Sequence, residues 1–234
     1  MKTLAIDTSL AAGSVAALHD GRVAERRLDV PGEHARLLVA AVAEAAAELG
    51  WQPHDADLIA VIRGPGSFTG LRVGVATAKA LAWATGGRLV GASGFEVIAA
   101  LTARLTGRRD QSLAIGFDAG RGDAYVATAM PSSASVTGWE IGPAAIYPVA
   151  EWIAALPSGT VVSGPALESA SPALAARLDL VVAPPESWQT SAVEAGRLAL
   201  LRAAVGTVDD AFTLVPEYLR PSYADERRAG TLGP

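Results

Sequence analysis

The sequence predicts an α/β fold in which one series of strands and helices occurs twice. Each half of the 234 residues begins with an apolar strand that ends in an acidic residue, AID at Asp7 and GFD at Asp118. In each half, small residues follow that Asp and turn the chain into a second strand. Beyond these strands, helical and extended patterns alternate, which is typical of α/β proteins.

The first half is expected to contain three antiparallel strands followed by alternating helices and strands. The Asp20-Gly21 pair between two apolar runs is a strong hairpin signal. Gly50 and the Gly86-Gly87 pair are expected to end the first two helices. The predicted strands are residues 3–8, 13–18, 22–29, 58–62 and 88–91, and the predicted helices are residues 34–49, 71–85 and 95–105.

The second half is expected to repeat this order. Its predicted strands are residues 112–117, 123–130, 136–141, 160–163 and 178–183, and its predicted helices are residues 149–156, 172–177 and 190–205. Two units of the order β-β-β-α-β-α-β-α indicate a duplicated ribonuclease-H-like lobe, which is the actin-like fold of the actin and sugar-kinase (ASKHA) class.

The boundary between the lobes is expected where polar residues interrupt the apolar pattern, at GRRDQ, residues 107–111. The N-terminal lobe is therefore predicted to cover residues 1–108 and the C-terminal lobe residues 109–214. The remaining residues, 215–234, form a Pro-rich and charged tail whose end is expected to be disordered.

The composition excludes several classes of site. The chain has no Cys, and its three His residues (His19, His34 and His54) have no metal-ligand spacing, so neither thiol catalysis nor a Cys- or His-based metal site is expected. The formal charge is −5, whereas a protein that itself grips nucleic acid usually carries a basic excess. Met1-Lys2 leads directly into an apolar strand, and no apolar run has the length of a membrane span, so a cytoplasmic protein without membrane contact is expected.

Two segments are candidates for contact with phosphate. In actin-like folds, the first hairpin faces the phosphates of a nucleotide and its carboxylate holds magnesium through water; a simple hairpin-capping role for Asp7 is equally supported. The loop GPGSFTG, residues 64–70, leads into a helix N-terminus that suits an anion. It lacks the Lys of a Walker A loop, so a tight strand-to-helix turn is the favoured interpretation. The candidate contacts, each of them vestigial, are Asp7, Thr8, Ser9, Ser67, Thr69, Arg72 and Asp118.

The first two helices are apolar nearly all round, which favours a partner surface. Residues 37–47 contain a single charge, Glu44, and residues 71–85 contain only Arg72 and Lys79. A helix that only covers a sheet should show a polar outer face. The alternative is that other parts of the same chain cover both helices. The predicted partner interface consists of Leu37, Leu38, Ala41, Val42, Ala45, Gly74, Val75, Ala78, Leu81 and Ala82.

Three motifs together resemble the TsaB/YeaZ family. They are LAIDTS at residues 4–9, GPGSFTGLRVGVATAKALAW at residues 64–83, and FDAGRGDAYVA at residues 117–127. The central motif is the most specific of the three, and PEYLR at residues 216–220 resembles the family's C-terminal P-x-Y-x-R. The resemblance covers the first half and the opening of the second, and it is weak beyond Tyr125.

The resemblance implies a non-catalytic subunit of the machinery that places threonylcarbamoyl on the adenosine beside the anticodon in tRNAs reading codons that begin with A. It implies pairing with the catalytic paralogue TsaD through the first two helices, docking of the ATPase TsaE on the assembly, and contact with tRNA only through the complex. It also implies a homodimer when the chain is isolated. The chain would hold no cofactor of its own, and ATP or ADP with magnesium would bind at the interface of the assembled complex. The H-x-x-x-H metal motif of TsaD is absent from this sequence.

Two enzyme interpretations are the alternatives. An actin-like ATPase or kinase would use Asp7 and Asp118 on two phosphate hairpins, and would need a third acidic residue and a Gly-rich adenosine loop in the second half. The candidates there, Ser163-Gly164-Pro165 and Glu168, are few. A glycoprotease-like metallopeptidase is disfavoured because its metal ligands are missing.

Overall fold

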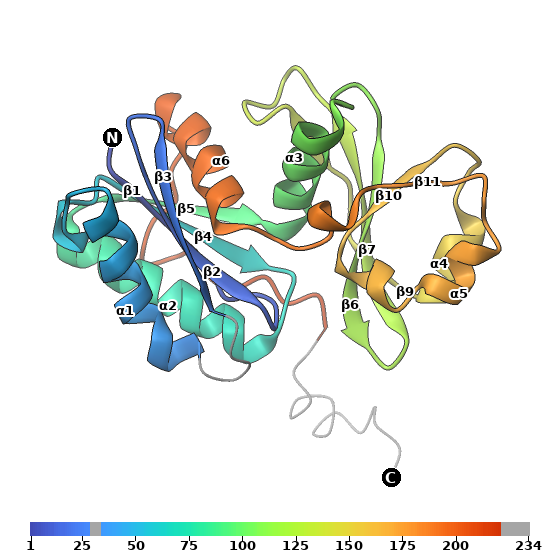
Figure 1. Ribbon diagram of the computed structural model, residues 1–234, viewed down its shortest axis with the longest axis horizontal. Helices are drawn as coiled ribbons and strands as arrows, with labels where there is room; N and C mark the ends of the chain where they lie inside the picture. Colours follow the sequence, from blue (N-terminus) through green and yellow to red (C-terminus); the bar gives the residue numbers. More distant parts are fainter. Residues whose placement is uncertain (29–33, 221–234) are drawn as a thin grey trace, which may run out of the picture.

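The computed structural model describes residues 1–28 and 34–220, and it contains two sheets side by side (Figure 1). The first sheet has the order β3-β2-β1-β4-β5. Strands β1, β2 and β3 form an antiparallel meander, and β4 and β5 run parallel to β1. The strands are β1 (Thr3–Asp7), β2 (Gly13–His19), β3 (Arg22–Leu28), β4 (Leu58–Gly64) and β5 (Arg88–Ser93).

The second sheet repeats this arrangement with one additional strand. Its order is β11-β10-β6-β7-β8, and β9 also pairs with β7. Strands β10 and β11 run parallel to β6, whereas β7 is antiparallel to β6, β8 and β9. The duplicated α/β fold is thus confirmed, although β9 was not predicted. The strands are β6 (Leu113–Gly120), β7 (Asp123–Pro131), β8 (Trp139–Ile141), β9 (Ala145–Pro148), β10 (Val161–Ser163) and β11 (Val181–Val182).

Two helices cover one face of the first sheet, α1 (His34–Glu48) and α2 (Phe68–Thr85). Their inward residues form one core with β1, β2 and β4. Helix α2 begins three residues before the predicted start because Ser67 is its N-cap, and the Ser67 hydroxyl accepts a hydrogen bond from the Gly70 N–H at 3.1 Å. None of the helices within the described residues is both long and apolar enough to cross a membrane.

The last helix of each half packs on the sheet of the other half. Helix α3 (Gly94–Thr106) packs against β6, β7 and β8 of the second sheet, with Phe95 in edge-to-face contact with Phe117. Helix α6 (Ala192–Ala204) covers the first sheet on the face opposite α1 and α2. The sequence interpretation grouped α6 with residues 109–214, whereas its packing partners lie within residues 1–108.

The approach of α6 to the first sheet is close because it presents small residues. A Cβ atom at Gly196 would lie 2.6 Å from a methyl carbon of Leu18 and 3.2 Å from the Cβ of Ala5. No larger side chain fits there without moving the helix.

The outer part of the second lobe is built from short helices around Trp152 and Ile153. The segment predicted as a helix at 172–177 is helical at Ser171–Ala175, and the strand predicted at 178–183 is reduced to the two residues of β11. The short helices of the second lobe are α4 (Val149–Ala155) and α5 (Ser171–Ala175). The chain also forms 3-10 turns, η1 (Pro53–Asp55) in the first lobe and η2 (Pro165–Glu168) and η3 (Pro185–Ser187) in the second.

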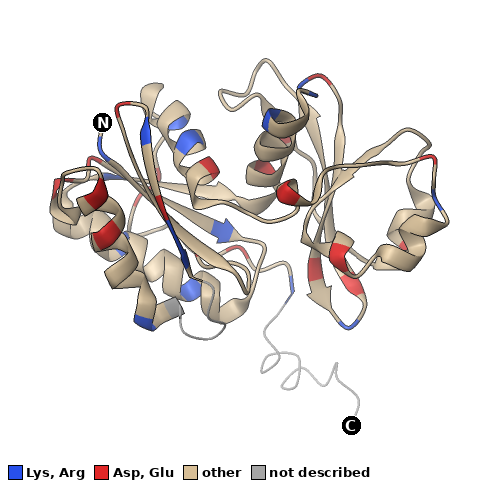
Figure 2. Ribbon diagram, in the orientation of Figure 1, with Lys and Arg blue, Asp and Glu red and all other residues tan. Residues whose placement is uncertain are grey.

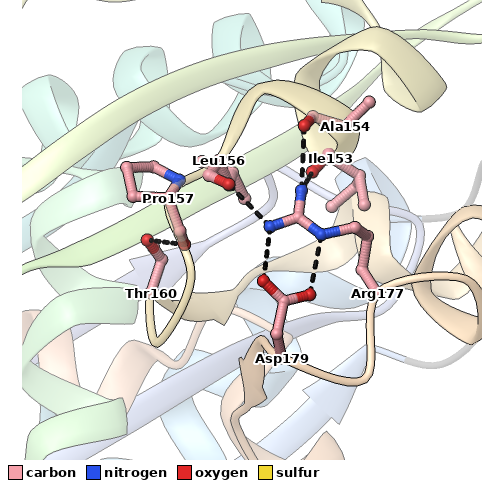
Figure 3. A network of polar contacts seen from close by, with 7 residues as sticks. All are labelled: Ile153, Ala154, Leu156, Pro157, Thr160, Arg177 and Asp179. Atoms are coloured by element: carbon pink, nitrogen blue, oxygen red, sulfur yellow. Dashed lines mark hydrogen bonds and ion pairs between the residues drawn. The ribbon is translucent and has the colours of Figure 1, made fainter.

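Arg177 ties the end of α4 to the loop before β11 (Figure 3). Its guanidinium donates to the carbonyls of Ile153, Ala154 and Leu156 at 2.7, 2.9 and 2.6 Å, and to both carboxylate oxygens of Asp179 at 2.8 and 2.9 Å. The carbonyls at a helix C-terminus have no partner within the helix, so this cation satisfies them. The hydrogen bonds from Arg177 lower the pKa of the Asp179 carboxyl to about 2.

The depressed pKa of Asp179 predicts an acid-dependent contribution to stability. The Asp179 carboxylate stabilises the fold fully above its ordinary pKa of 3.8, and this stabilisation is lost as the pH falls towards about 2. The difference in urea midpoint between the wild type and Asp179→Asn should therefore be largest above about pH 4 and vanish near pH 2. Asp110→Asn is the matched control, and a difference that stays constant over this range would contradict the assignment.

Candidate functional site

Asp7 is buried and bound within the chain at the end of β1. One carboxylate oxygen accepts hydrogen bonds from the backbone N–H of Ser9 at 2.9 Å and from its hydroxyl at 2.6 Å. The other oxygen accepts from the hydroxyl of Thr190, which precedes α6. Asp7 therefore holds the first hairpin to the start of α6, and the geometry favours the structural interpretation of this residue.

The loop between β4 and α2 packs on the same hairpin. The Thr8 hydroxyl donates to the Gly70 carbonyl at 2.7 Å, and the Ser67 N–H donates to the Ser9 carbonyl at 2.7 Å. A Cβ atom at Gly70 would collide with the carbonyl oxygen of Thr8, so only glycine allows this approach. The structure thus brings Thr8, Ser9 and Ser67 together, and each of them bonds within the chain.

The remaining residues of the phosphate prediction lie apart from this cluster. Thr69 is exposed in the first turn of α2. Arg72 turns towards the C-terminal segment, where its Nε donates to the Tyr218 hydroxyl at 2.9 Å and its guanidinium carbon lies 3.8 Å from the centre of the Phe68 ring. Asp118 is exposed on the second hairpin, and its carboxylate accepts from the Gly120 N–H at 2.7 Å.

A cavity of about 520 Å³ separates the two hairpins. Asp118 and Glu168 line it from the second lobe, and the apolar residues 10–12 line it from the first. The described lining residues include no Lys or Arg, so the cavity presents carboxylates to any phosphate that enters. The described residues also contain no group of three or more His, Cys, Asp or Glu side chains placed to hold a metal ion.

Residues 209–220 form a strap that the sequence did not predict. The Asp209 N–H donates to the Leu89 carbonyl at 2.8 Å, Leu214 is buried in the core of the first lobe, and the Glu217 N–H donates to the Arg63 carbonyl at 2.7 Å. The strap therefore follows the β5 edge of the first lobe. Residues 215–220 of the predicted tail belong to it, and the disorder predicted for the end of the tail falls on residues 221–234, outside the described residues.

The strap ends by joining the first lobe to the second. Tyr218 lies against Phe68 of α2, with ring centres 4.8 Å apart. Two residues later, the Arg220 guanidinium donates to the Ala119 carbonyl at 3.0 Å and forms an ion pair of 2.7 Å with Asp123. The PEYLR motif is thus the segment that clamps the β6–β7 hairpin to α2.

Arg220→Met is expected to release the end of the strap while leaving both sheets intact. Loss of a charged hydrogen-bond donor that is mostly buried costs about 1 kcal/mol, or roughly 2–4 °C in melting temperature for a chain of this size. Amide hydrogen exchange at residues 217–220 should accelerate, and Arg109→Met serves as the control of equal charge change. Unchanged exchange in this segment would show that Arg220 does not clamp the lobes.

The predicted partner-interface residues face inwards, so that prediction is wrong in its choice of helix face. Both helices carry few charged residues, but those few, Arg36, Glu44 and Glu48 on α1 and Arg72 on α2, are exposed and mark the outward faces. Leu37 and Leu81 are half-buried against the core of the first lobe. The other eight residues are buried, and they are Leu38, Ala41, Val42, Ala45, Gly74, Val75, Ala78 and Ala82.

Apolar residues lie among these charges on the outward faces of α1 and α2. Val39 is 72 % exposed and Trp83 is 80 % exposed. Most of the other exposed apolar positions on the two helices are alanines. The exposed face of α1 and α2 is defined here as Val39, Ala40, Ala43, Ala47, Ala76, Ala80, Trp83 and Ala84.

Comparison with known proteins identifies the family. The sequence profile of tRNA N6-adenosine threonylcarbamoyltransferase (TsaD) matches residues 29–176, which is more than half of the chain. The chain is also 35 % identical over 125 residues to "tRNA threonylcarbamoyladenosine biosynthesis protein TsaB" of Escherichia coli K12, and 36 % identical over 127 residues to the protein of the same name from Bacillus subtilis. The chain belongs to the TsaB/YeaZ group of the TsaD family.

The matched region covers part of each TsaB relative, and the structural likeness extends further. Each of the two alignments spans 53 % of this chain and 53 % of the relative, so about half of the length of these proteins is matched. The solved structure of YeaZ from Pseudomonas aeruginosa superimposes with a TM-score of 0.77 at 26 % identity, covering 93 % of this chain and 99 % of that one. A second structure from Pseudomonas aeruginosa, of a protein described as similar to peptidase YeaZ, gives a TM-score of 0.76 at 27 % identity, covering 94 % of this chain and 99 % of that one. The TsaB/YeaZ resemblance and the duplicated lobed fold are confirmed.

Proposed function

We propose that this TsaB/YeaZ-family chain is a non-catalytic subunit that supports threonylcarbamoyl transfer to the adenosine beside the anticodon in tRNAs reading codons that begin with A. It would act by binding the catalytic paralogue TsaD. The observation that carries the proposal is the exposed face of α1 and α2, where Val39 and Trp83 stand out in solvent. An apolar helical face of this kind is typical of a protein interface.

The chemistry of this face favours a second pair of helices as its occupant. Alanines dominate it, so the backbone of another helix can approach closely. Trp83 and Val39 would supply the larger buried side chains, and full burial of such a residue contributes roughly 2 kcal/mol. A TsaD partner with the same lobed fold would offer its corresponding helices, and in its absence a second copy of this chain would dock in the same way as a homodimer.

A supporting rather than catalytic role fits the residues of the cavity between the hairpins. Its carboxylates Asp118 and Glu168 would repel phosphate, and Asp7 is occupied by Ser9 and Thr190. We propose that the chain holds no cofactor of its own, and that ATP or ADP with magnesium binds at the interface of the assembled complex, where TsaE also docks. The acidic net charge of −5 supports contact with tRNA through the complex rather than by this chain alone. We place this activity in the cytoplasm as part of the same proposal.

The test is co-purification of this chain with TsaD from the same organism, followed by a tRNA-modification assay with and without the chain. We expect stoichiometric pairing and modification that depends on the chain. ATP hydrolysis by the isolated chain without pairing would instead support the actin-like ATPase that uses Asp7 and Asp118. The isolated chain should run as a dimer by light scattering, and TsaD should convert that dimer into a heterodimer.

A further inference from the structure

A second cavity, of about 510 Å³, opens between α3 and α6. It lies on the α6 side of the first sheet, whereas the exposed face of α1 and α2 lies on the other side. Its floor is apolar and comes from both lobes, with Leu198 from α6, Ala100 from α3 and Trp139 from β8. A cavity of this volume is in the range that holds a small molecule.

Three arginines surround this apolar floor. Arg104 of α3 and Arg197 of α6 both pair with the carboxylate of Glu194, at 3.0 and 3.1 Å, and Arg109 lines the cavity from the loop after α3. Basic residues are visible on both helices in Figure 2. Three arginines and one glutamate line the cavity, so these four residues carry a net charge of +2 there.

Two of the three arginines, Arg104 and Arg197, are held in place before any ligand arrives. Glu194 is only 5 % exposed, and each of Arg104 and Arg197 uses one nitrogen to bond it, so further N–H donors remain on each guanidinium. Beside them, the buried carboxylate of Glu96 is bonded by Arg202 of α6 and by the hydroxyl of Thr137, which lines the cavity from the second lobe. The Glu96–Arg202 ion pair is neutral overall, so it supports the wall of the cavity without changing the net charge of the cavity.

We propose that this cavity binds a phosphate monoester whose organic group carries a flat aromatic ring. A phosphate monoester carries a charge of about −1.5 to −2 at neutral pH, which matches the charge of the arginine cluster. Guanidinium groups suit phosphate oxygens because they donate two parallel hydrogen bonds. The ring would lie on the floor formed by Leu198, Ala100 and Trp139. The site is separate from both hairpins and from the exposed face of α1 and α2, so it does not depend on the proposed partner.

Isothermal titration calorimetry of the full chain with three probes tests the proposal. The probes are adenosine monophosphate, which has both the ring and the phosphate, adenosine, which has the ring alone, and inorganic phosphate. We expect the monophosphate to bind at least tenfold more tightly than either of the others. Equal affinity for adenosine and its monophosphate, or no binding of the monophosphate at millimolar concentration, would overturn the proposal.

Two variants and a matched control locate the binding. Arg109→Gln removes a guanidinium that has no role in the Glu194 pair, and Arg197→Gln leaves Glu194 paired with Arg104. Each should weaken binding of the monophosphate roughly tenfold or more, because a hydrogen bond to a charged group is lost. Arg108→Gln makes the same charge change at the adjacent residue, which lies outside this cavity and lines another. Equal losses in all three variants would indicate non-specific attraction and would refute the site.

Discussion

Ala80→Glu is expected to abolish binding of TsaD while leaving the chain folded. Ala80 lies on the exposed face of α2, so a carboxylate there is solvated in the free chain and becomes buried without a partner only in the complex. An unpaired charge in an interface costs several kcal/mol, which corresponds to a loss of affinity of about a hundredfold or more. The measurement is the dissociation constant for TsaD together with the melting temperature of the variant.

Ala78→Glu on the same helix is the control that separates binding from folding. Ala78 is 0 % exposed and packs in the core of the first lobe, so a glutamate there must bury its charge in every state of the folded chain. The free-energy cost of burying this charge is a large part of the roughly 5–15 kcal/mol by which a domain is stable. We therefore expect little folded protein. If Ala80→Glu binds TsaD as tightly as the wild type does, the exposed face of α1 and α2 is not the docking surface.

Asp7→Ala is expected to destabilise the chain far more than Asp118→Ala does. Without the Asp7 carboxylate, the Ser9 N–H, the Ser9 hydroxyl and the Thr190 hydroxyl lose their acceptor at a buried position. Unsatisfied buried donors cost about 1–3 kcal/mol each, so we expect a loss of about 3 kcal/mol and a fall of roughly 6–12 °C in melting temperature. Asp118 is exposed and accepts from Gly120 on its own hairpin, so Asp118→Ala should cost less than about 1 kcal/mol.

Thermal unfolding monitored by circular dichroism measures both effects. Asp7→Asn keeps one acceptor oxygen and should fall between Asp7→Ala and the wild type. An actin-like ATPase makes the opposite prediction, because both Asp variants would then lose ATP hydrolysis with little change in stability. Equal and small shifts in melting temperature for Asp7→Ala and Asp118→Ala would argue against the structural role of Asp7.

Local patterns predicted most of the fold. The Asp20-Gly21 turn, the alternating apolar runs and the glycines after the first two helices determine elements whose bounds agree closely with those of β1 to β5 and α1. Strand β9 was missed because its four residues are bounded by proline and carry no alternation strong enough to mark them. The placement of α6 on the first sheet was missed because it depends on contacts between residues nearly 200 positions apart, such as Gly196 with Ala5.

The candidate site was less predictable from the sequence, for two physical reasons. The first is phase, since the prediction gave no weight to the few charged residues of the first two helices: Glu44 on α1 and Arg72 on α2 are exposed and mark the outward faces, as Trp83 does. The second is environment, since Asp7 and Asp118 occupy equivalent positions in their hairpins but differ in burial. The arginines between α3 and α6 are far apart in sequence, so only the fold brings Arg104 and Arg197 to one carboxylate.

The reciprocal packing of α3 and α6 makes the chain resemble a domain-swapped pair whose two members are covalently joined. Neither residues 1–108 nor residues 109–214 contain the helix that covers the inner face of their own sheet. The first fragment alone would expose Ala5, Ala60 and Val90 to water, and the second alone would expose Ile115 and Phe117. When the two fragments are produced together, they should instead associate and restore the native fold. A cut in the GRRDQ loop at residues 107–111 would therefore turn this protein into a split reporter of its own assembly.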